Sequence, residues 1–392
     1  MISWTKLLSS PNDLKRGFEN NGQDIKPVIV WNITSSCNLS CCHCYLESSK
    51  IPAAEILDTQ KCKKIILDLA GFGVPALLFS GGEPLLRKDI FELAEFSRRY
   101  GIRPVLSSNG TLITESKARK IKTSGIEYAG ISIDGKPDTH DKLRGEKGSF
   151  KKAALGIRNC KDAGVKVGVR FTLMKDNSKD LDFIFNFARK EKVNRLCIYH
   201  LVYSGRGRRE KELSLEEKRD CLELIWNYSD TFHREDEQTE ILTVDNHCDG
   251  VWIYHKMLKF DEERANKILN SLLKSGGNQS GVCIGCIDYR GDVYIDQFTR
   301  GHSLGNVTKR KFGEIWEDES NPLLYGLRHR RDFIKGRCKG CSFFSICNGN
   351  MRARAQAVYG DFWEEDPGCY LSNEEINVDG YPADILGNYK GL

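Results

Sequence analysis

The sequence predicts an α/β fold, in which an open, partial barrel of six βα units over residues 28–209 precedes a small cysteine-rich domain over residues 280–371. Strand-like apolar runs alternate with segments of helical periodicity from residue 28 to about 203. Repeated βα units imply parallel strands joined by right-handed crossovers, and a closed barrel would need eight of them. The 392 residues leave room for a second, smaller domain.

Six apolar, β-branched runs are the expected strands of this (β/α)6 TIM-like partial barrel. Catalytic groups of such barrels lie at the C-terminal ends of the strands, so the residues after each run are the first candidates. We expect residues 1–27 to be an N-terminal segment, residues 210–279 a Glu- and Lys-rich helical linking region, and residues 372–392 a C-terminal tail. The six runs are 28–33, 76–80, 104–107, 129–133, 165–173 and 196–202.

Charge and composition exclude several classes of protein. The chain has 59 basic and 54 acidic residues, and a net charge of +5 is too small to predict a nucleic-acid partner, although it suits an anionic substrate. No apolar stretch approaches the roughly 18 residues that cross a membrane, and the first residues lack the apolar core of a signal peptide. The 15 cysteines therefore predict metal ligation in a reducing cytoplasm rather than disulfides.

Three cysteines, Cys37, Cys41 and Cys44, directly follow the first expected strand. Thiolates suit an iron–sulfur cluster or zinc, but a closed site of either kind takes four protein ligands. No fourth ligand follows at a suitable spacing, because Cys42 adjoins a ligand and His43 lies between two of them. The triplet therefore predicts a [4Fe-4S] cluster with one open iron, against the alternative of zinc or a structural role.

Gly81-Gly82-Glu83-Pro84 follows the second expected strand. The two glycines let the backbone approach a ligand closely, and Glu83 can fix an ammonium group. The alternative is a plain turn between a strand and a helix, because short glycine-rich motifs are weak signals.

Polar residues recur at the ends of the later strands. Their hydroxyl, amide and carboxylate groups can hold a ribose and an amino acid, while Arg144 or Arg170 can meet a carboxylate. Each alone is more often an ordinary capping or turn residue, but recurrence at successive strand ends favours a binding site. These residues are Ser108, Asn109, Ser132 and Asp134.

A second cysteine constellation comprises Cys338, Cys341, Cys347 and Cys369. Four thiolates satisfy a closed site, so zinc and a fully ligated [4Fe-4S] cluster both fit the ligands. Upstream, residues 283–296 predict a β-hairpin that turns at Arg290-Gly291. We expect the remaining scattered cysteines to be inert core residues, namely Cys62, Cys160, Cys197, Cys221 and Cys248.

Over residues 28–371 these motifs resemble the radical SAM superfamily with a SPASM/twitch-type C-terminal domain. The resemblance implies that the Cys37 triplet ligates a [4Fe-4S] cluster that binds S-adenosylmethionine (SAM), that residues 81–84 bind the SAM methionyl amine, and that the four later cysteines hold one auxiliary [4Fe-4S] cluster. Asp296 and Met351 stand where a second auxiliary cluster would need cysteines. We therefore do not expect Cys283 or Cys286 to be ligands.

Within this superfamily the sequence is similar to the enzymes of sirohaem-derived tetrapyrrole synthesis. The resemblance implies an iron tetrapyrrole substrate and removal of two acetate side chains from 12,18-didecarboxysirohaem to give Fe-coproporphyrin III. Removal of propionates in haem d1 synthesis is the alternative, and the sequence does not separate the two. The segments that carry the resemblance are 26–34, 199–207, 285–292, 305–307, 347–350 and 365–371.

The mechanism that this resemblance implies begins with electron transfer from the reduced cluster into SAM. The C–S bond breaks, and a 5'-deoxyadenosyl radical abstracts hydrogen from a substrate side chain. The auxiliary cluster is expected to transfer an electron, and a ferredoxin or flavodoxin to supply one. Two other classes stay open: a peptide-modifying maturase, disfavoured because only 27 residues precede the first expected strand, and a metal scaffold, which leaves the open site unexplained.

The segment after the sixth expected strand supplies candidate substrate residues. Arg206 and Arg208 could meet the carboxylates of a polyanionic macrocycle, and His200 could donate a proton or approach the iron. The alternative is that the arginines belong to a solvated loop and that His200 is a satisfied core residue.

Overall fold

The structure, a computed structural model, describes residues 1–9, 25–51 and 56–376. Parts of the expected N-terminal segment and C-terminal tail, residues 10–24 and 377–392, lie outside the described residues. All six expected strands are present, and they pair in parallel in chain order, which confirms the partial βα barrel. They are β2 (Val28–Asn32), β3 (Ala76–Ser80), β4 (Arg103–Ser108), β5 (Tyr128–Ser132), β6 (Lys166–Leu173) and β7 (Arg195–His200).

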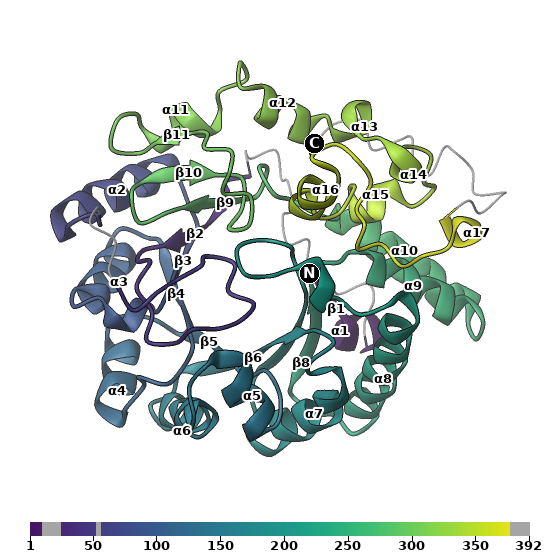
Figure 1. Cartoon of the computed structure of the whole chain (residues 1–392), viewed down its shortest axis with the longest axis horizontal. Helices are drawn as coiled ribbons and strands as arrows, with labels where there is room; N and C mark the ends of the chain where they lie inside the picture. The colour runs from purple at the N-terminus through teal and green to yellow at the C-terminus, as the bar shows by residue number, and fades with distance from the viewer. Residues whose placement is uncertain (10–24, 52–55, 377–392) are drawn as a thin grey trace.

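Helices between these strands cover the outer face of the sheet (Figure 1). In α2 (Thr59–Phe72) the buried residues Cys62, Ile65, Ile66 and Leu69 follow helical spacing, and the Asp58 side chain caps the first turn by accepting from Lys61 N–H. The other helices of this layer are α3 (Ile90–Arg99), α4 (Glu115–Thr123), α5 (Pro137–Arg144), α6 (Ser149–Asp162) and α7 (Leu181–Lys190).

The sheet continues into the region that we expected to be a helical linker. Strand β8 (Glu240–Val244) pairs in parallel with β7, and β1 (Ile2–Ser3) pairs antiparallel with β8. The region therefore adds a further βα unit to the barrel. The sequence did not indicate this strand, because its short apolar run lies between strongly charged flanks. Its helices are α8 (Leu215–Arg234), α9 (Cys248–Leu258) and α10 (Glu262–Ser275), and α1 (Trp4–Ser9) packs on α8.

At the opposite edge, the expected hairpin joins the same sheet. Strand β9 (Ile284–Ile287) pairs in parallel with β2, and β10 (Asp292–Tyr294) returns antiparallel to it after Gly291, whose φ is +90°. A short strand, β11 (Gly305–Asn306), closes this edge. The hairpin prediction is confirmed, and the barrel sheet runs without a break into the cysteine-rich region.

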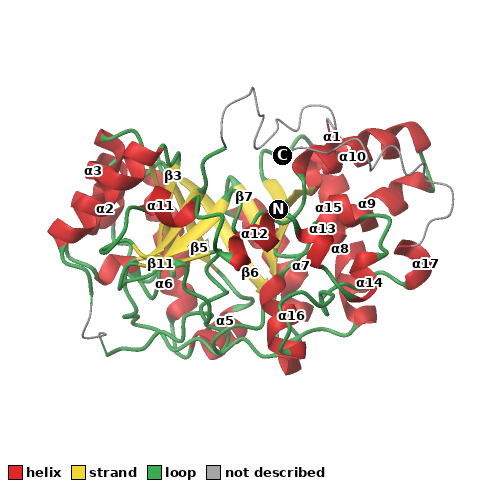
Figure 2. Ribbon diagram, turned by 90° about the horizontal axis from the view of Figure 1, so that it is seen from above, coloured by secondary structure: helices red, strands yellow, loops and turns green. Residues whose placement is uncertain are grey.

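Short helices follow: α11 contacts α2 beside β11, whereas α14 to α17 lie on the side of α9 and α10 (Figures 1 and 2). Helix α15 contacts both α9 and α10. None of the helices in the described ranges is long and apolar enough to cross a membrane. The short helices are α11 (Phe312–Trp316), α12 (Pro322–Arg328), α13 (Arg330–Phe333), α14 (Gly336–Lys339), α15 (Phe344–Cys347), α16 (Arg352–Tyr359) and α17 (Asn373–Ile376).

Strand alternation separates two apolar environments. Leu196 and Ile198 of β7 belong to the large core between sheet and helices. Their neighbours Cys197 and Tyr199 point the other way and cluster with residues of β8 on the inner face of the barrel. This alternation decides which strand-end residues can face a ligand inside the barrel.

Candidate functional site

The loop after β2 brings Cys37, Cys41 and Cys44 into one cluster around Leu39. Burial, with Glu83 and the other two thiols nearby, raises the pKa of the Cys37 thiol to about 12. Leu39 N–H donates to Cys37 Sγ at 3.4 Å. Three thiols in a buried pocket repel one another as thiolates, and a bound cation relieves that repulsion. The donor set therefore fits a metal cluster held by three protein ligands.

Residues after β7 hold this loop from one side. Arg206 Nε donates to the Cys41 carbonyl at 2.7 Å, its Nη1 to the Ser48 carbonyl at 3.1 Å and its backbone N–H to the Cys44 carbonyl at 2.9 Å. Arg206 is therefore engaged by the cysteine loop, while its buried Nη2 has no hydrogen-bond partner. Arg208 is exposed, as the alternative interpretation of that segment has it.

The end of α5 holds the same loop from the other side. The carbonyls of Arg144 and Leu143 accept from Ser40 and Cys42 N–H at 3.1 and 3.0 Å. Arg144 Nη1 donates to Cys41 Sγ at 3.6 Å, and Nη2 lies 2.6 Å from Asp134 Oδ2. A ligand carboxylate would therefore have to compete with Asp134 for the Arg144 guanidinium.

Asp134 is completely buried among groups of the protein itself. Its Oδ2 also lies 3.2 Å from His43 Nε2, and its Oδ1 accepts from Thr172 N–H at 3.2 Å. Burial alone would raise the pKa of this carboxyl, but Arg144 and His43 hold it below its usual range. We expected Asp134 to bind ligand; the structure instead shows it fastening the cysteine loop to β5 and α5.

The Gly81-Gly82 pair lies tightly against the residues before Cys37. An added Cβ at Gly81 would lie 2.3 Å from Thr34 O, and one at Gly82 would lie 2.0 Å from Ser36 O. Gly82 and Glu83 N–H donate to those same carbonyls at 2.8 Å. Only glycine fits here, so the motif fixes the loop, and Pro84 then begins the short 3-10 helix Pro84–Leu86.

The Glu83 carboxylate is also fully occupied by donors of the chain. It accepts from Ser108 Oγ at 3.0 Å, Asn109 N–H at 2.8 Å and Leu85 N–H at 3.0 Å, and it is 0% exposed. Glu83 therefore ties the end of β3 to the end of β4.

Asn109 continues this connection to the cysteine loop. Its Nδ2 donates to Asn38 Oδ1 at 2.9 Å and lies 3.8 Å from Cys37 Sγ, while its Oδ1 accepts from Thr111. Of the predicted ligand-binding residues, the structure thus brings Glu83, Ser108, Asn109 and Arg144 together with the cysteine triplet.

Arg170 lies on the inner face of the barrel. Its Nη1 donates to Ser107 Oγ, and its guanidinium covers Gly130, where an added Cβ would lie 2.2 Å from Nε. The Arg170 Nε is buried and makes no hydrogen bond. Ser132, half-buried, is its partner in the β5–β6 register. Arg170 therefore offers an unused donor to an anionic group inside the barrel.

His200 points to the helix layer, as Leu196 and Ile198 do. Its Nε2 lies 2.9 Å from Asp249 Oδ2, and the other oxygen of Asp249 accepts from Tyr370 OH at 2.7 Å. His200 is 4% exposed. It is a satisfied core residue, and the proposed contact with substrate or iron does not fit this placement.

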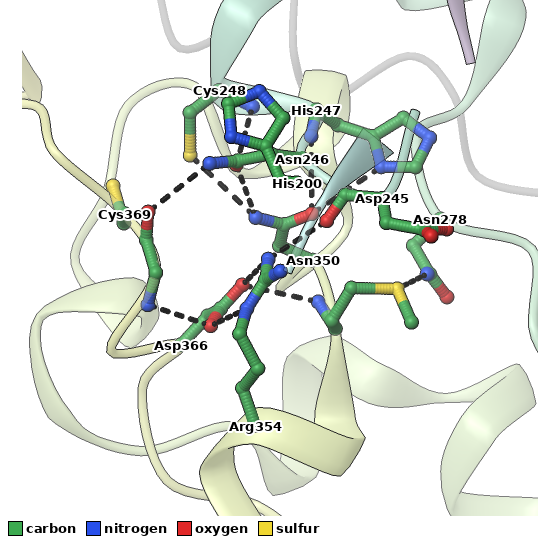
Figure 3. A network of polar contacts seen from close by, with 12 residues as sticks. His200, Asp245, Asn246, His247, Cys248, Asn278, Asn350, Arg354, Asp366 and Cys369 are labelled. Atoms are coloured by element: carbon green, nitrogen blue, oxygen red, sulfur yellow. Dashed lines mark hydrogen bonds and ion pairs between the residues drawn. The ribbon is translucent and has the colours of Figure 1, made fainter. Parts of the chain in front are cut away.

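The four later cysteines line one cavity, which also contains Arg337, Phe343 and Asp366. Asp366 forms a buried ion pair with Arg354, with Nη2 and Oδ2 2.7 Å apart, and accepts from Gly368 N–H beside Cys369 (Figure 3). Across the described ranges, no three His, Cys, Asp or Glu side chains converge tightly enough to hold a single metal ion. The thiols surround a space instead of meeting at one point.

Two neighbouring cysteines do not line this cavity. Cys286 Sγ accepts from Asn32 Nδ2 at 3.5 Å within the barrel, and Cys283 contacts Gln279. Sequence reasoning missed one member, because Cys248 also lines the cavity. No signal in the sequence connects Cys248 to cysteines that begin 90 positions later.

An open three-cysteine loop at the C-terminal edge of a partial βα barrel is the arrangement expected of a radical SAM enzyme, and the comparisons with known proteins agree with this class. The sequence model of the radical SAM superfamily matches residues 31–188. The described chain superposes on Streptococcus suis SuiB bound to S-adenosylmethionine with a TM-score of 0.70 and 18% identity, covering 88% of this chain and 78% of that one.

Closer relatives narrow the class. Fe-coproporphyrin III synthase of Methanosarcina barkeri is 48% identical and covers 90% of each chain. Pre-heme d1 synthase of Dinoroseobacter shibae is 37% identical and covers 90% of this chain and 88% of that one. The chain belongs to the radical SAM superfamily and, within it, to the enzymes of tetrapyrrole and haem synthesis. A [4Fe-4S] cluster and SAM are the cofactors of this class.

Proposed function

We propose that the chain removes the two acetate side chains of 12,18-didecarboxysirohaem and so forms Fe-coproporphyrin III. The observation that carries this proposal is the 48% identity to Fe-coproporphyrin III synthase over 90% of both chains. Removal of propionates towards haem d1 is the second candidate, supported by the 37% identity to pre-heme d1 synthase. The higher identity favours the acetate reaction.

Cys37, Cys41 and Cys44 would hold the cluster whose open iron binds SAM. When bound and reduced, this pair supplies a 5'-deoxyadenosyl radical that abstracts hydrogen from a substrate side chain. Arg206 and Arg144 orient the cysteine loop through the contacts described above. The burial of Cys37 and Cys41 keeps water from the ligands.

Arg170 is the residue that we assign to an anionic group inside the barrel. The buried Nε of Arg170 and that of Arg144 both lack a hydrogen-bond partner, but the Arg144 guanidinium is already paired with Asp134. A guanidinium binds a carboxylate with two parallel hydrogen bonds, so Arg170 suits the carboxylate of SAM. The half-buried hydroxyl of Ser132 lies beside it in register.

Cys338, Cys341, Cys347 and Cys369 would hold an auxiliary [4Fe-4S] cluster. A cubane fills a volume between its ligands, and these four thiols line one cavity. We assign it an electron-transfer role during turnover, with a reduced ferredoxin or flavodoxin as the external donor. All fifteen cysteines are free thiols, which supports a reducing compartment such as the cytoplasm.

The test is anaerobic turnover of 12,18-didecarboxysirohaem with reductant and SAM, followed by mass spectrometry of the tetrapyrrole. The proposal predicts a product that has lost two acetate groups and retains every propionate. A product that has lost propionates would establish the second candidate. An unchanged tetrapyrrole, with a modified peptide found instead, would support a maturase.

A further inference from the structure

A fifth cysteine, Cys248, lies in the cavity of the four proposed auxiliary ligands. It is the first residue of α9, which follows β8, so the barrel delivers this thiol while the other four come from the C-terminal region. Its side chain is 2% exposed. Figure 3 shows Cys248 and Cys369 near each other at one end of the polar network.

Contacts on both sides fix the position of this thiol. Cys248 and Cys369 line the same cavity, and their side chains interact there. Asn350 Nδ2 lies 3.8 Å from Cys248 Sγ and donates to Asn246 Oδ1 at 2.6 Å. Asn350 Oδ1 accepts from the backbone N–H of His247 at 3.0 Å. The amide of Asn350 thus joins the cysteine-rich region to the turn that carries Cys248.

The backbone of Asn350 indicates that this connection is specific. Its φ is +56°, a left-handed conformation that residues other than glycine adopt at a cost. Its side chain is 1% exposed, and both its oxygen and its nitrogen are used by the turn of residues 246–248. An inert buried cysteine would need apolar neighbours only.

Resting on the proposed auxiliary cluster, we infer that Cys248 is a fifth thiol of that site. With Cys369 bound to iron, Cys248 S–H donates a hydrogen bond to the ligating sulfur. When Cys369 is absent, Cys248 takes its place as fourth ligand. That substitution exchanges an S–H bond for an S–Fe bond and releases one proton to solvent, with no electron transferred. A hydrogen bond to a ligating sulfur favours the reduced, more negative cluster and raises its reduction potential.

The test uses the full chain with Cys37, Cys41 and Cys44 all changed to Ala, so that the auxiliary cluster is the iron site under study. Five changes are compared in this background: Cys248→Ala, Cys248→Ser, Cys369→Ala, Cys248→Ala combined with Cys369→Ala, and Cys160→Ala as a control. Cys160 is 0% exposed in the large core, far in sequence from either cysteine site. The readouts are iron per chain, the paramagnetic resonance spectrum of the reduced cluster, and its midpoint potential.

The inference predicts that Cys248→Ala keeps as much iron as the background variant but moves the midpoint potential of the cluster to more negative values. Cys248→Ser keeps an O–H donor and should reverse part of that shift. Cys369→Ala should keep its iron with an altered spectrum, and the double variant should lose it. Cys160→Ala should change nothing. Equal iron in Cys369→Ala and the double variant, or a midpoint potential that Cys248→Ala does not move, would overturn the role of Cys248 but leave the auxiliary cluster in place. A background variant without iron would overturn the auxiliary cluster itself.

Discussion

The two cysteine sites are built in different ways. Cys37, Cys41 and Cys44 come from one loop of eight residues. Contacts from four other segments hold that loop in place: the Gly81-Gly82 turn, Asn109 after β4, the end of α5 and the residues after β7. The C-terminal cavity instead takes its thiols from several separate segments, including α9 of the barrel. A local site needs a rigid surround, whereas a dispersed site needs long-range contacts that bring its ligands together.

The electrostatics of the two sites differ accordingly. Around the first loop, Arg144 bridges Asp134 and Cys41, and the loop carbonyls are taken by Arg206. Beside the second, the buried Arg354–Asp366 pair also reaches the barrel, because Arg354 donates to the carbonyls of Leu201 and Asp245 at 3.1 and 2.8 Å. The second site therefore depends on the junction between the two halves of the chain.

The largest expected effect separates the sites by chemistry. Changing Cys37, Cys41 and Cys44 together to Ala should reduce iron from about eight to about four atoms per chain, because one of two cubanes is lost. Formation of 5'-deoxyadenosine should fall below detection, since SAM has no open iron to bind. Iron analysis and chromatography measure both quantities. Continued formation of 5'-deoxyadenosine would show that SAM binds elsewhere.

Asp366→Ala tests the junction beneath the second site. It leaves the Arg354 guanidinium, which is 0% exposed, without its counter-ion. Removing one partner of a buried pair costs about 3–5 kcal/mol. Hydrogen exchange of amides in α14 to α16 should show a fall of that size in local opening free energy.

The matched control is Asp318→Ala, which breaks the more exposed pair with Arg310 and should lower the local opening free energy far less. Equal effects of the two substitutions would mean that the buried pair does not support the cysteine-rich region.

Glu83→Ala tests whether the first site depends on its surround. The substitution removes the acceptor of Ser108, Asn109 and Leu85, so the ends of β3 and β4 lose their connection beside the cysteine loop. We expect SAM to bind about 10–100-fold more weakly, the equivalent of about 1.5–3 kcal/mol for hydrogen bonds to a charged group. Anaerobic calorimetry measures this affinity. Ser108→Ala, which removes one donor, should have a smaller effect, and unchanged binding in Glu83→Ala would reject the connection.

Arg206→Ala and Arg208→Ala form a matched pair with the smallest expected effects. Arg206 loses side-chain bonds to two loop carbonyls, which we expect to cost about 1–3 kcal/mol of loop stability and to speed the loss of cluster absorbance. Because Arg208 is exposed, Arg208→Ala should change the stability of the loop by less than about 0.5 kcal/mol. If Arg206→Ala instead abolished tetrapyrrole binding with its cluster intact, this residue would be a substrate contact.

The difference between the sites also explains what could be predicted from the sequence. The six strands and the cysteine triplet are local patterns, and the structure confirms the strands and places the three thiols together. The orientation of the His200 side chain could not be predicted from the sequence, because β7 is apolar on both faces. Its alternation therefore does not show which residues face the inside of the barrel and which face the helices. Cys248 and the Arg354–Asp366 pair join segments far apart in sequence, and only the fold brings them together.

The central claim is that one site cleaves SAM while the other serves a later step. It is tested most directly by measuring 5'-deoxyadenosine and the tetrapyrrole product together in Cys341→Ala and in the unaltered chain. Cys341 lines the C-terminal cavity. We predict that this variant still forms 5'-deoxyadenosine but makes little or no Fe-coproporphyrin III. Product formation at the unaltered rate, or loss of both products, would contradict the division of roles.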